Sequence, residues 1–276
     1  LLDYQLEPVI YNFRSLQEFI KIFEESGYTQ AGIHIELDTG MHRLGFNENQ
    51  IPELLNELKH NKKIKVKSLF SHLTSSDMPE QDQYTLDQIN KFIKLSQLIE
   101  TEINYSFLKH ILNTAGIIRF SQYQMDMVRL GIGLYGIDPD PQHSALLEEA
   151  MTLKTSISQI HHLKTGDAVS YGRRFVADKE MKIATIPIGY ADGYRRDLGN
   201  GKAYVSINGK KASIVGAVCM DMCMVNLEGI DAKEGDEVIL FGPQLSVQIL
   251  ADLLNTIPYE ILTGIAHRVK RIYYYE

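Results

Sequence analysis

Several features that mark particular protein classes are scarce in this sequence of 276 residues, which has no Trp and two Cys. Cys219 and Cys223 lie close together in CMDMC, with no second Cys or His pair at zinc spacing, so we expect neither a disulfide framework nor a metal site. No apolar run approaches the roughly 18 residues of a membrane span, and no signal peptide opens the chain. We therefore expect a cytoplasmic protein with no membrane partner.

An excess of positive charge is also lacking. The chain has 28 Lys and Arg against 35 Asp and Glu, a formal net charge of −7, and its basic residues are spread along the sequence. This argues against a nucleic-acid partner, which needs a basic patch. Hydrophobic residues make up 44% and charged residues 23%, the balance of an ordinary globular protein, and the length suits one large or two medium domains.

Residues 8 to about 140 alternate short apolar runs with long amphipathic ones, a pattern typical of β/α units around a parallel sheet. The first helix is expected to begin at a capping box of Ser15 and Glu18 and to end at Gly27. The other expected elements are helices over 50–61 and 84–100, and strands over 31–38, 66–73, 108–116 and 127–136.

Polar residues occur where each of these expected strands ends. In a (β/α)₈ barrel, the carboxyl ends of the strands converge on one face, where the active site is built. The recurrence of polar residues at successive strand ends therefore favours a shared site over ordinary loop polarity. They are Asp38, Thr39 and Arg43, then His72, then Asn113 and Thr114, and finally Arg129.

From about residue 147 the long helical patterns give way to short β runs, which predict an all-β domain over 147–276 after a barrel domain over 1–146. Asn208 and Gly209 lie between two alternating runs and predict a hairpin turn, since both tolerate positive φ. A last helix is expected at 246–256, followed by an extended tail. The expected strands are 154–163, 167–176, 182–190, 202–209, 212–218, 223–227 and 236–242.

Seven motifs, in this order, resemble those of the alanine racemases: LDTGMHRLGF (37–46), SHLTSSD (71–77), NTAG (113–116), VRLGIGLYG (128–136), SYGRRF (170–175), IPIGYADGYRR (186–196) and VGAVCMDMCMV (215–225). Each motif is weak alone, but their order covers almost the whole chain. The resemblance implies an α/β fold in which a partial (β/α)₈ TIM-type barrel precedes an all-β domain. It also implies a pyridoxal 5'-phosphate enzyme that interconverts L-alanine and D-alanine for peptidoglycan, in a homodimer with shared active sites.

Removing the Cα proton of an amino acid requires an electron sink, which the imine of this cofactor supplies, and racemisation needs a base on each face. The resemblance assigns one base to Tyr171, acting in the partner's site, and the other to the cofactor's lysine. It assigns support of the phenolate to His72, because an unperturbed phenol is a poor base at neutral pH. Arg129 is matched to the pyridine nitrogen, where a guanidinium weakens the sink, and His110 to the support of Arg129.

The same resemblance distributes the remaining roles. Small hydroxyls and backbone N–H groups suit a phosphate, and a cation or N–H group suits the substrate carboxylate. The resemblance assigns the phosphate site to Asn113, Thr114 and the backbone of Gly131 and Ile132. It assigns the substrate carboxylate to Arg43 and the backbone of Met220, with Cys219 and Asp221 in the same loop as Met220. Tyr190 is matched to the tyrosine that narrows the substrate entrance.

Two departures from the family pattern stand out. The family carries its cofactor lysine in a pattern like VKAxAYG on the first barrel strand, and no segment here matches it. We therefore expect this chain to be a carboxyl-terminal portion that lacks about three strands of the barrel and is inactive by itself. His267 stands where some racemases place a tyrosine against the phosphate.

Four alternatives are left open by the sequence. The protein could be a racemase of broader specificity, or a decarboxylase or aldolase on the same barrel, although Arg129 argues against a decarboxylase. It could be a non-catalytic oligomerising module, or part of a fusion with an upstream peptidoglycan ligase.

Overall fold

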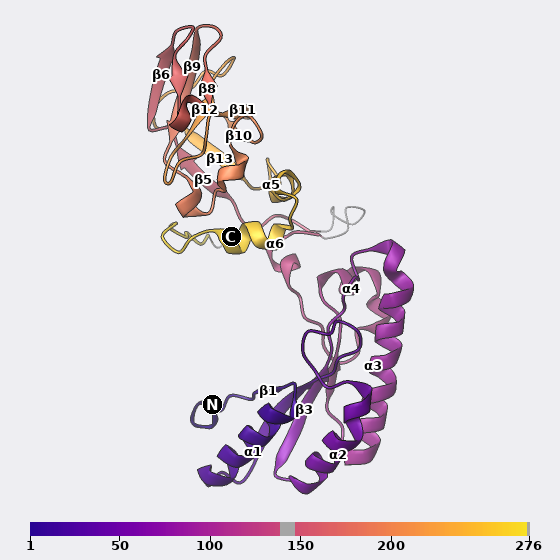
Figure 1. Ribbon diagram of the computed structural model, residues 1–276. Helices are drawn as coiled ribbons and strands as arrows, with labels where there is room; N and C mark the ends of the chain where they lie inside the picture. Colours follow the sequence, from indigo (N-terminus) through magenta and orange to yellow (C-terminus); the bar gives the residue numbers. More distant parts are fainter. Residues whose placement is uncertain (139–146, 275–276) are drawn as a thin grey trace. The chain divides into compact units, whose positions relative to one another are not determined.

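The structure is a computed structural model that describes residues 1–138 and 147–274 (Figure 1). It divides into two compact units, which are considered separately. The barrel unit comprises Leu1–Leu134 and Asp138, and the β unit comprises Tyr135–Ile137 and 147–274. Within the described residues, none of the helices is both long and apolar enough to cross a membrane.

The barrel unit contains one parallel four-stranded sheet in the order β1-β2-β3-β4. Apolar residues of β2 and β3, such as Ile33, Ile35 and Leu69, are fully buried between the sheet and its helices. The strands are Val9–Ile10, Ala31–Glu36, Ile64–Phe70 and Leu108–His110, and the helices are α1 Phe13–Ser26, α2 Ile51–His60, α3 Asp82–Ile103 and α4 Thr114–Arg119, with 3-10 turns at Leu2–Tyr4, Glu48–Gln50, Pro79–Gln81, Ser121–Tyr123 and Ile132–Tyr135. Because the strands are parallel, the carboxyl ends of β2, β3 and β4 lie on one edge of the sheet.

The expected start of the first helix is wrong. The capping residue of α1 is Asn12, whose side-chain oxygen accepts the Ser15 amide N–H at 2.8 Å, while the Ser15 hydroxyl oxygen reaches the amide of Asn12. Glu18 instead pairs with Arg14 one turn earlier. Asn12 has an extended backbone, directly after β1, so the strand pairing of β1 fixes where the helix begins. The expected end at Gly27 is confirmed, with φ of 75°.

The strand expected over 127–136 is also wrong, and the one expected over 108–116 is shorter than expected. After β4, Asn113 caps α4, so residues 114–116 are helical. Two backbone hydrogen bonds, from the amide of Asp126 to the carbonyl of Lys109 (3.2 Å) and from the amide of Arg129 to the carbonyl of Leu112 (3.0 Å), form a strand-like pairing. The chain then bends, because the amides of Gly131 and Gly133 donate to the Thr114 hydroxyl oxygen rather than to a neighbouring strand.

The β unit is built on an antiparallel seven-stranded sheet in the order β5-β13-β10-β11-β12-β9-β6, beside a β7-β8 pair. The hairpin expected at Asn208 and Gly209 is confirmed: both have positive φ (49° and 74°), and Ile207 pairs with Lys210. The strands are β5 Leu153–Ser156, β6 Gln159–Leu163, β7 Ala168–Val169, β8 Phe175–Val176, β9 Met181–Ile186, β10 Tyr204–Ile207, β11 Lys210–Val215, β12 Cys223–Asn226 and β13 Glu237–Phe241, with 3-10 turns at Tyr171–Arg173, Tyr190–Asp192 and Arg196–Leu198.

The expected helix over 246–256 is confirmed as α5, Val247–Leu254. The tail that follows was expected to be extended, but it contains α6, Pro258–Gly264. Pro258 occupies the first helical position, where its missing N–H and fixed φ are favourable. A short helix of this kind has too few turns to show the periodicity by which the longer helices are recognised.

Candidate active site

Arg129 lies at the carboxyl edge of the parallel sheet and is held from several sides. One terminal nitrogen donates to the carbonyl oxygens of Ser71 (2.6 Å) and Ile111 (3.4 Å), and the other to the carbonyl oxygen of His110 (3.3 Å) and to Nδ1 of its ring. The guanidinium also lies 5.1 Å from the centroid of the Phe70 ring. These contacts fix Arg129, which lies in a loop, to the ends of β3 and β4.

The electrostatic surroundings of Arg129 keep the neighbouring imidazole neutral. Burial, together with the charge of Arg129 and the proximity of His34, lowers the pKa of His110 to about 4. Its ring stacks on Phe70, with centroids 5.1 Å apart and planes within 4°. Burial also lowers the pKa of Arg129, against the attraction of Glu36, but a guanidinium remains charged in proteins. A cation is thus held next to a neutral hydrogen-bond acceptor.

Glu36, the last residue of β2, was missed by the sequence analysis. Among the residues that the structure describes, it is the one Asp or Glu that is counted as buried, with 7% of its surface exposed. Burial raises the pKa of its carboxyl group, and the positive charges of Arg43 and Arg129 oppose that rise. A charged residue at the end of an apolar strand, directly before the LDTG motif, was the signal that could have identified it.

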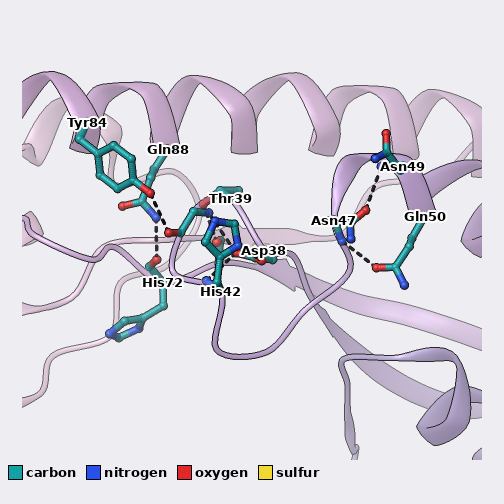
Figure 2. Close-up of polar contacts among 11 residues, drawn as sticks. Asp38, Thr39, His42, Asn47, Asn49, Gln50, His72, Tyr84 and Gln88 are labelled. Carbon is teal, nitrogen blue, oxygen red and sulfur yellow. Dashed lines mark hydrogen bonds and ion pairs between the residues drawn. The ribbon is translucent and has the colours of Figure 1, made fainter.

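His72 follows β3 on the same edge and is partly buried. Burial, Arg129 and Arg43 together lower the pKa of His72 to about 4, so the imidazole is neutral at physiological pH. Its backbone carbonyl accepts a hydrogen bond from the Gln88 side chain of α3 (3.2 Å), and Figure 2 shows its ring pointing away from Gln88. His72 can therefore support a phenolate by donating a hydrogen bond, but not by carrying a charge.

The loop that carries Arg43 is fixed around Asp38 (Figure 2). The Asp38 carboxylate accepts the amides of Gly40 and His42, both at 3.0 Å, and contacts the His42 ring at 2.7 Å. Burial tends to raise the pKa of Asp38, but these hydrogen bonds lower it overall. The Tyr84 hydroxyl of α3 donates to the carbonyl of Gly40 at 2.7 Å. Arg43 itself is exposed, so a loop held by these hydrogen bonds presents a cation at the surface.

Thr114 lies at the centre of a cluster of small donors after β4. Its hydroxyl oxygen accepts the amides of Gly131 (3.0 Å) and Gly133 (3.3 Å). Asn113 caps α4 and accepts the Ser76 hydroxyl at 2.8 Å. A Cβ atom at Gly133 would lie 2.7 Å from a Leu130 methyl and 2.9 Å from the Thr114 methyl, so only glycine fits without displacement.

This donor set suits pyridoxal 5'-phosphate. Hydroxyl and amide donors gather beside Thr114, as a phosphate requires, and Arg129 presents N–H groups that could meet a pyridine nitrogen. In the barrel unit, the structure therefore collects Arg43, His72, His110, Asn113, Thr114, Arg129, Gly131 and Ile132 along the carboxyl edge of the sheet and the loops that follow it.

In the β unit, three loops carry the other predicted residues to one place. The Ser170 hydroxyl, next to Tyr171, contacts the backbone of Ala217 and lies 3.9 Å from the Cys219 sulfur. The amide of Tyr190 donates to the carbonyl of Cys219 at 3.0 Å, and the next amide donates to that of Met220. Tyr171, Tyr190, Cys219, Met220 and Asp221 therefore lie on adjoining loops, with Tyr171 74% exposed.

The Tyr190 loop is also tied to the end of the chain. The Asp192 carboxylate accepts the amide of Gly189 at 2.9 Å and forms an ion pair with Arg268 at 2.7 Å. His267, beside Arg268, is exposed. The ion pair of Arg268 with Asp192 thus connects the region after α6 to the loop that carries Tyr190.

Comparisons with known proteins match nearly the whole chain to one family. Residues 1–139 match the family model described as the alanine racemase N-terminal domain, and residues 150–273 match that of the alanine racemase C-terminal domain. An alanine racemase of Clostridium novyi (strain NT) is 39% identical over 99% of this chain and 72% of its own length. The solved structure of the Clostridium difficile 630 enzyme is 34% identical, with a TM-score of 0.87 over 96% of this chain and 70% of the other. The Bartonella henselae alanine racemase, solved with covalently bound pyridoxal phosphate, is 29% identical, with a TM-score of 0.85 over 99% of this chain and 74% of the other.

Proposed function

The chain belongs to the alanine racemase family, and from this premise we propose how its residues serve the interconversion of L-alanine and D-alanine, the reaction that supplies D-alanine for peptidoglycan. The cofactor is pyridoxal 5'-phosphate. The observation that carries the assignment is the 39% identity over nearly the whole chain, together with a partly buried Arg129 held at the carboxyl edge of the barrel sheet.

When bound, the cofactor supplies the electron sink that makes the Cα proton of alanine removable. Arg129 would donate to its pyridine nitrogen; because guanidinium keeps its protons, that nitrogen stays unprotonated and the sink stays weak. A weak sink favours return of the proton to Cα over transamination. The phosphate would be held by Thr114, with Asn113 and the backbone of Gly131 and Ile132 around it.

Arg43 and the backbone N–H of Met220 would bind the substrate carboxylate, with Cys219 and Asp221 beside them and Tyr190 narrowing the entrance. The phenol oxygen of Tyr171 would exchange the proton at Cα. The neutral ring of His72 would hold the phenolate by a hydrogen bond, since its pKa of about 4 leaves it uncharged.

We also propose that two copies of the chain share their sites, so that Tyr171 serves the cofactor of the partner. A catalytic phenol needs a site that excludes water, yet in the β unit the side chain of Tyr171 is 74% exposed. A second barrel unit is the surface that would cover it. Sedimentation should therefore report a dimer for the holoenzyme, and a monomer with full activity would contradict this arrangement.

Proton NMR in D₂O tests the reaction with the enzyme expressed from its complete reading frame. Starting from either enantiomer, the α-proton signal of alanine should disappear while chiral chromatography shows inversion to an equal mixture. Release of CO₂ from alanine would indicate a decarboxylase, and accumulation of pyruvate would indicate that transamination dominates. Both outcomes, as well as inversion without exchange, contradict the proposal.

A further inference from the structure

We infer that Ser68, His34 and Glu7 are positioning residues for Arg129, acting through His110 as one chain of hydrogen bonds from Arg129 to His34 that ends in an ion-pair contact of His34 with Glu7. The hydrogen-bond pattern itself does not depend on the proposed function. Only its effect on catalysis rests on the proposed contact of Arg129 with the cofactor. The chain of contacts itself, called the relay below, consists of Arg129, His110, Ser68, His34 and Glu7.

The contacts run across three strands of the barrel sheet and end at the segment before β1. Beyond the Arg129 to His110 Nδ1 contact, His110 Nε2 lies 3.1 Å from the Ser68 hydroxyl oxygen. The same hydroxyl lies 2.7 Å from His34 Nδ1, and His34 Nε2 lies 3.2 Å from the Glu7 carboxylate. Every link is a direct contact between side chains, and both ends of the relay are charged.

When each imidazole carries a single proton, only one assignment of protons satisfies every link. Arginine has donors and no acceptor, so His110 Nδ1 must accept and the His110 proton must lie on Nε2. Nε2 then donates to the Ser68 oxygen. The Ser68 hydroxyl has one proton and must donate it to His34 Nδ1, which places the His34 proton on Nε2, facing the carboxylate of Glu7.

Arg129 sets the direction of the relay from one end, and the anion of Glu7 beside His34 Nε2 favours the same direction from the other end. If the His34 proton lay on Nδ1, it would donate to Ser68, and Ser68 would donate to His110 Nε2. His110 would then present Nδ1–H to the N–H of Arg129, two donors facing each other. A carboxylate that orients an imidazole through its far nitrogen is how proteins fix the tautomer of a functional histidine.

The relay residues next to Arg129 are buried. Ser68 and His110 are only 1% and 5% exposed, so an unmatched donor or acceptor there could not be satisfied by water. Toward Glu7 the relay becomes more accessible, with Lys67 Nζ 3.9 Å from its carboxylate. Gly32 of β2 makes room for this end, because a Cβ atom at that position would lie 2.4 Å from Glu7 Oε1.

Nitrogen NMR of the holoenzyme labelled with ¹⁵N-histidine tests the assignment directly. Wild type should show His110 and His34 each protonated on Nε2 and accepting a hydrogen bond at Nδ1, with the signals assigned by His110→Gln and His34→Gln. Either ring protonated on Nδ1 at neutral pH would overturn the inference. This measurement does not depend on what Arg129 contacts, so it separates failure of the relay from failure of the proposed function.

Ser68→Ala removes the central link and Ser96→Ala is the matched control. Ser96 is equally buried at 1%, and its hydroxyl donates to the carbonyl of Ile93 in α3, away from the relay. Ser68→Ala should leave the Nε2–H of His110 without its acceptor and so move the ¹⁵N signal of that nitrogen, and it should weaken the affinity for pyridoxal 5'-phosphate about 5- to 10-fold, as expected for one lost hydrogen bond. Ser96→Ala should change neither. Equal effects of the two variants would show that Ser68 is only structural.

Gly32→Ala probes the far end without replacing any relay residue. Its new methyl group should displace the Glu7 carboxylate and reproduce the histidine tautomer mixture of Glu7→Gln. Glu7→Asp, which keeps the anion, should restore part of the wild-type spectrum. If Gly32→Ala and Glu7→Gln both retain the wild-type tautomers, Glu7 does not direct the relay.

Discussion

The hydroxyl of Ser170 makes two hydrogen bonds to Ala217, donating to its carbonyl oxygen at 3.0 Å and accepting its amide N–H at 3.1 Å. Ser170 has a positive φ of 69° and directly precedes Tyr171. One side chain therefore connects the turn that carries the proposed base to the loop that carries the proposed carboxylate-binding amide of Met220.

Ser170→Ala should displace Tyr171 and reduce kcat about tenfold, the effect of roughly 1.4 kcal/mol of lost positioning. Steady-state kinetics with L-alanine would measure it. Ser246→Ala is the control, since the Ser246 hydroxyl caps α5 in the same unit and has no contact with the Tyr171 turn. If both variants lose activity equally, general destabilisation rather than positioning explains the loss.

Tyr171→Phe removes the proposed base while keeping the ring. Exchange of the alanine Cα proton should slow by about 10² to 10⁴, the usual contribution of a general base. Tyr273→Phe, at an equally exposed tyrosine of the tail, should exchange at the wild-type rate. Wild-type exchange by Tyr171→Phe from both enantiomers would refute the role.

The free energy of unfolding should depend on pH through His72 and His110, whose pKa values are lowered in the folded protein. Because the pKa of His72 and of His110 is about 4 in the folded protein, against 6.5 for an ordinary histidine, the unfolded chain binds more protons between these values. The free energy of unfolding should therefore fall as pH falls from about 6.5 towards 4, with no contribution from these groups above that window.

Thermal unfolding of wild type and His72→Gln across this range checks the sign. The variant should lose less stability on acidification than wild type. His162→Gln, at an exposed histidine of β6, should keep the wild-type slope. A steeper slope in His72→Gln would contradict the depressed pKa.

Asn12→Ala should lower the free energy of unfolding by about 1 kcal/mol, because it removes the acceptor that caps α1. Glu18→Ala should have a much smaller effect, since its pair with Arg14 is exposed. Urea titrations of both variants would distinguish the observed cap from the one expected from the sequence. The reverse order of effects would show that the helix begins at Ser15.

Long, periodic elements could be predicted because their patterns report burial directly. The helices α2 and α3, the strand β2 and the hairpin at Asn208 were all expected from the sequence and are confirmed. The cap of α1 could not be decided in this way, because both Asn12 and Ser15 begin acceptable capping patterns. The pairing of β1 with β2 determines that Asn12, and not Ser15, caps α1.

The sequence by itself determined the family, since ordered motifs need no coordinates, and it placed His72 and Thr114 at the ends of strands. Only the tertiary structure decided that residues 131–133 turn onto Thr114 instead of forming a strand, because the competing hydroxyl comes from another segment. It alone revealed Glu36 between two arginines and the relay from Glu7 to Arg129. The physical reason is that hydrogen bonds and charge interactions depend on which side chains meet across neighbouring strands, whereas local periodicity reports only which face of each strand is buried.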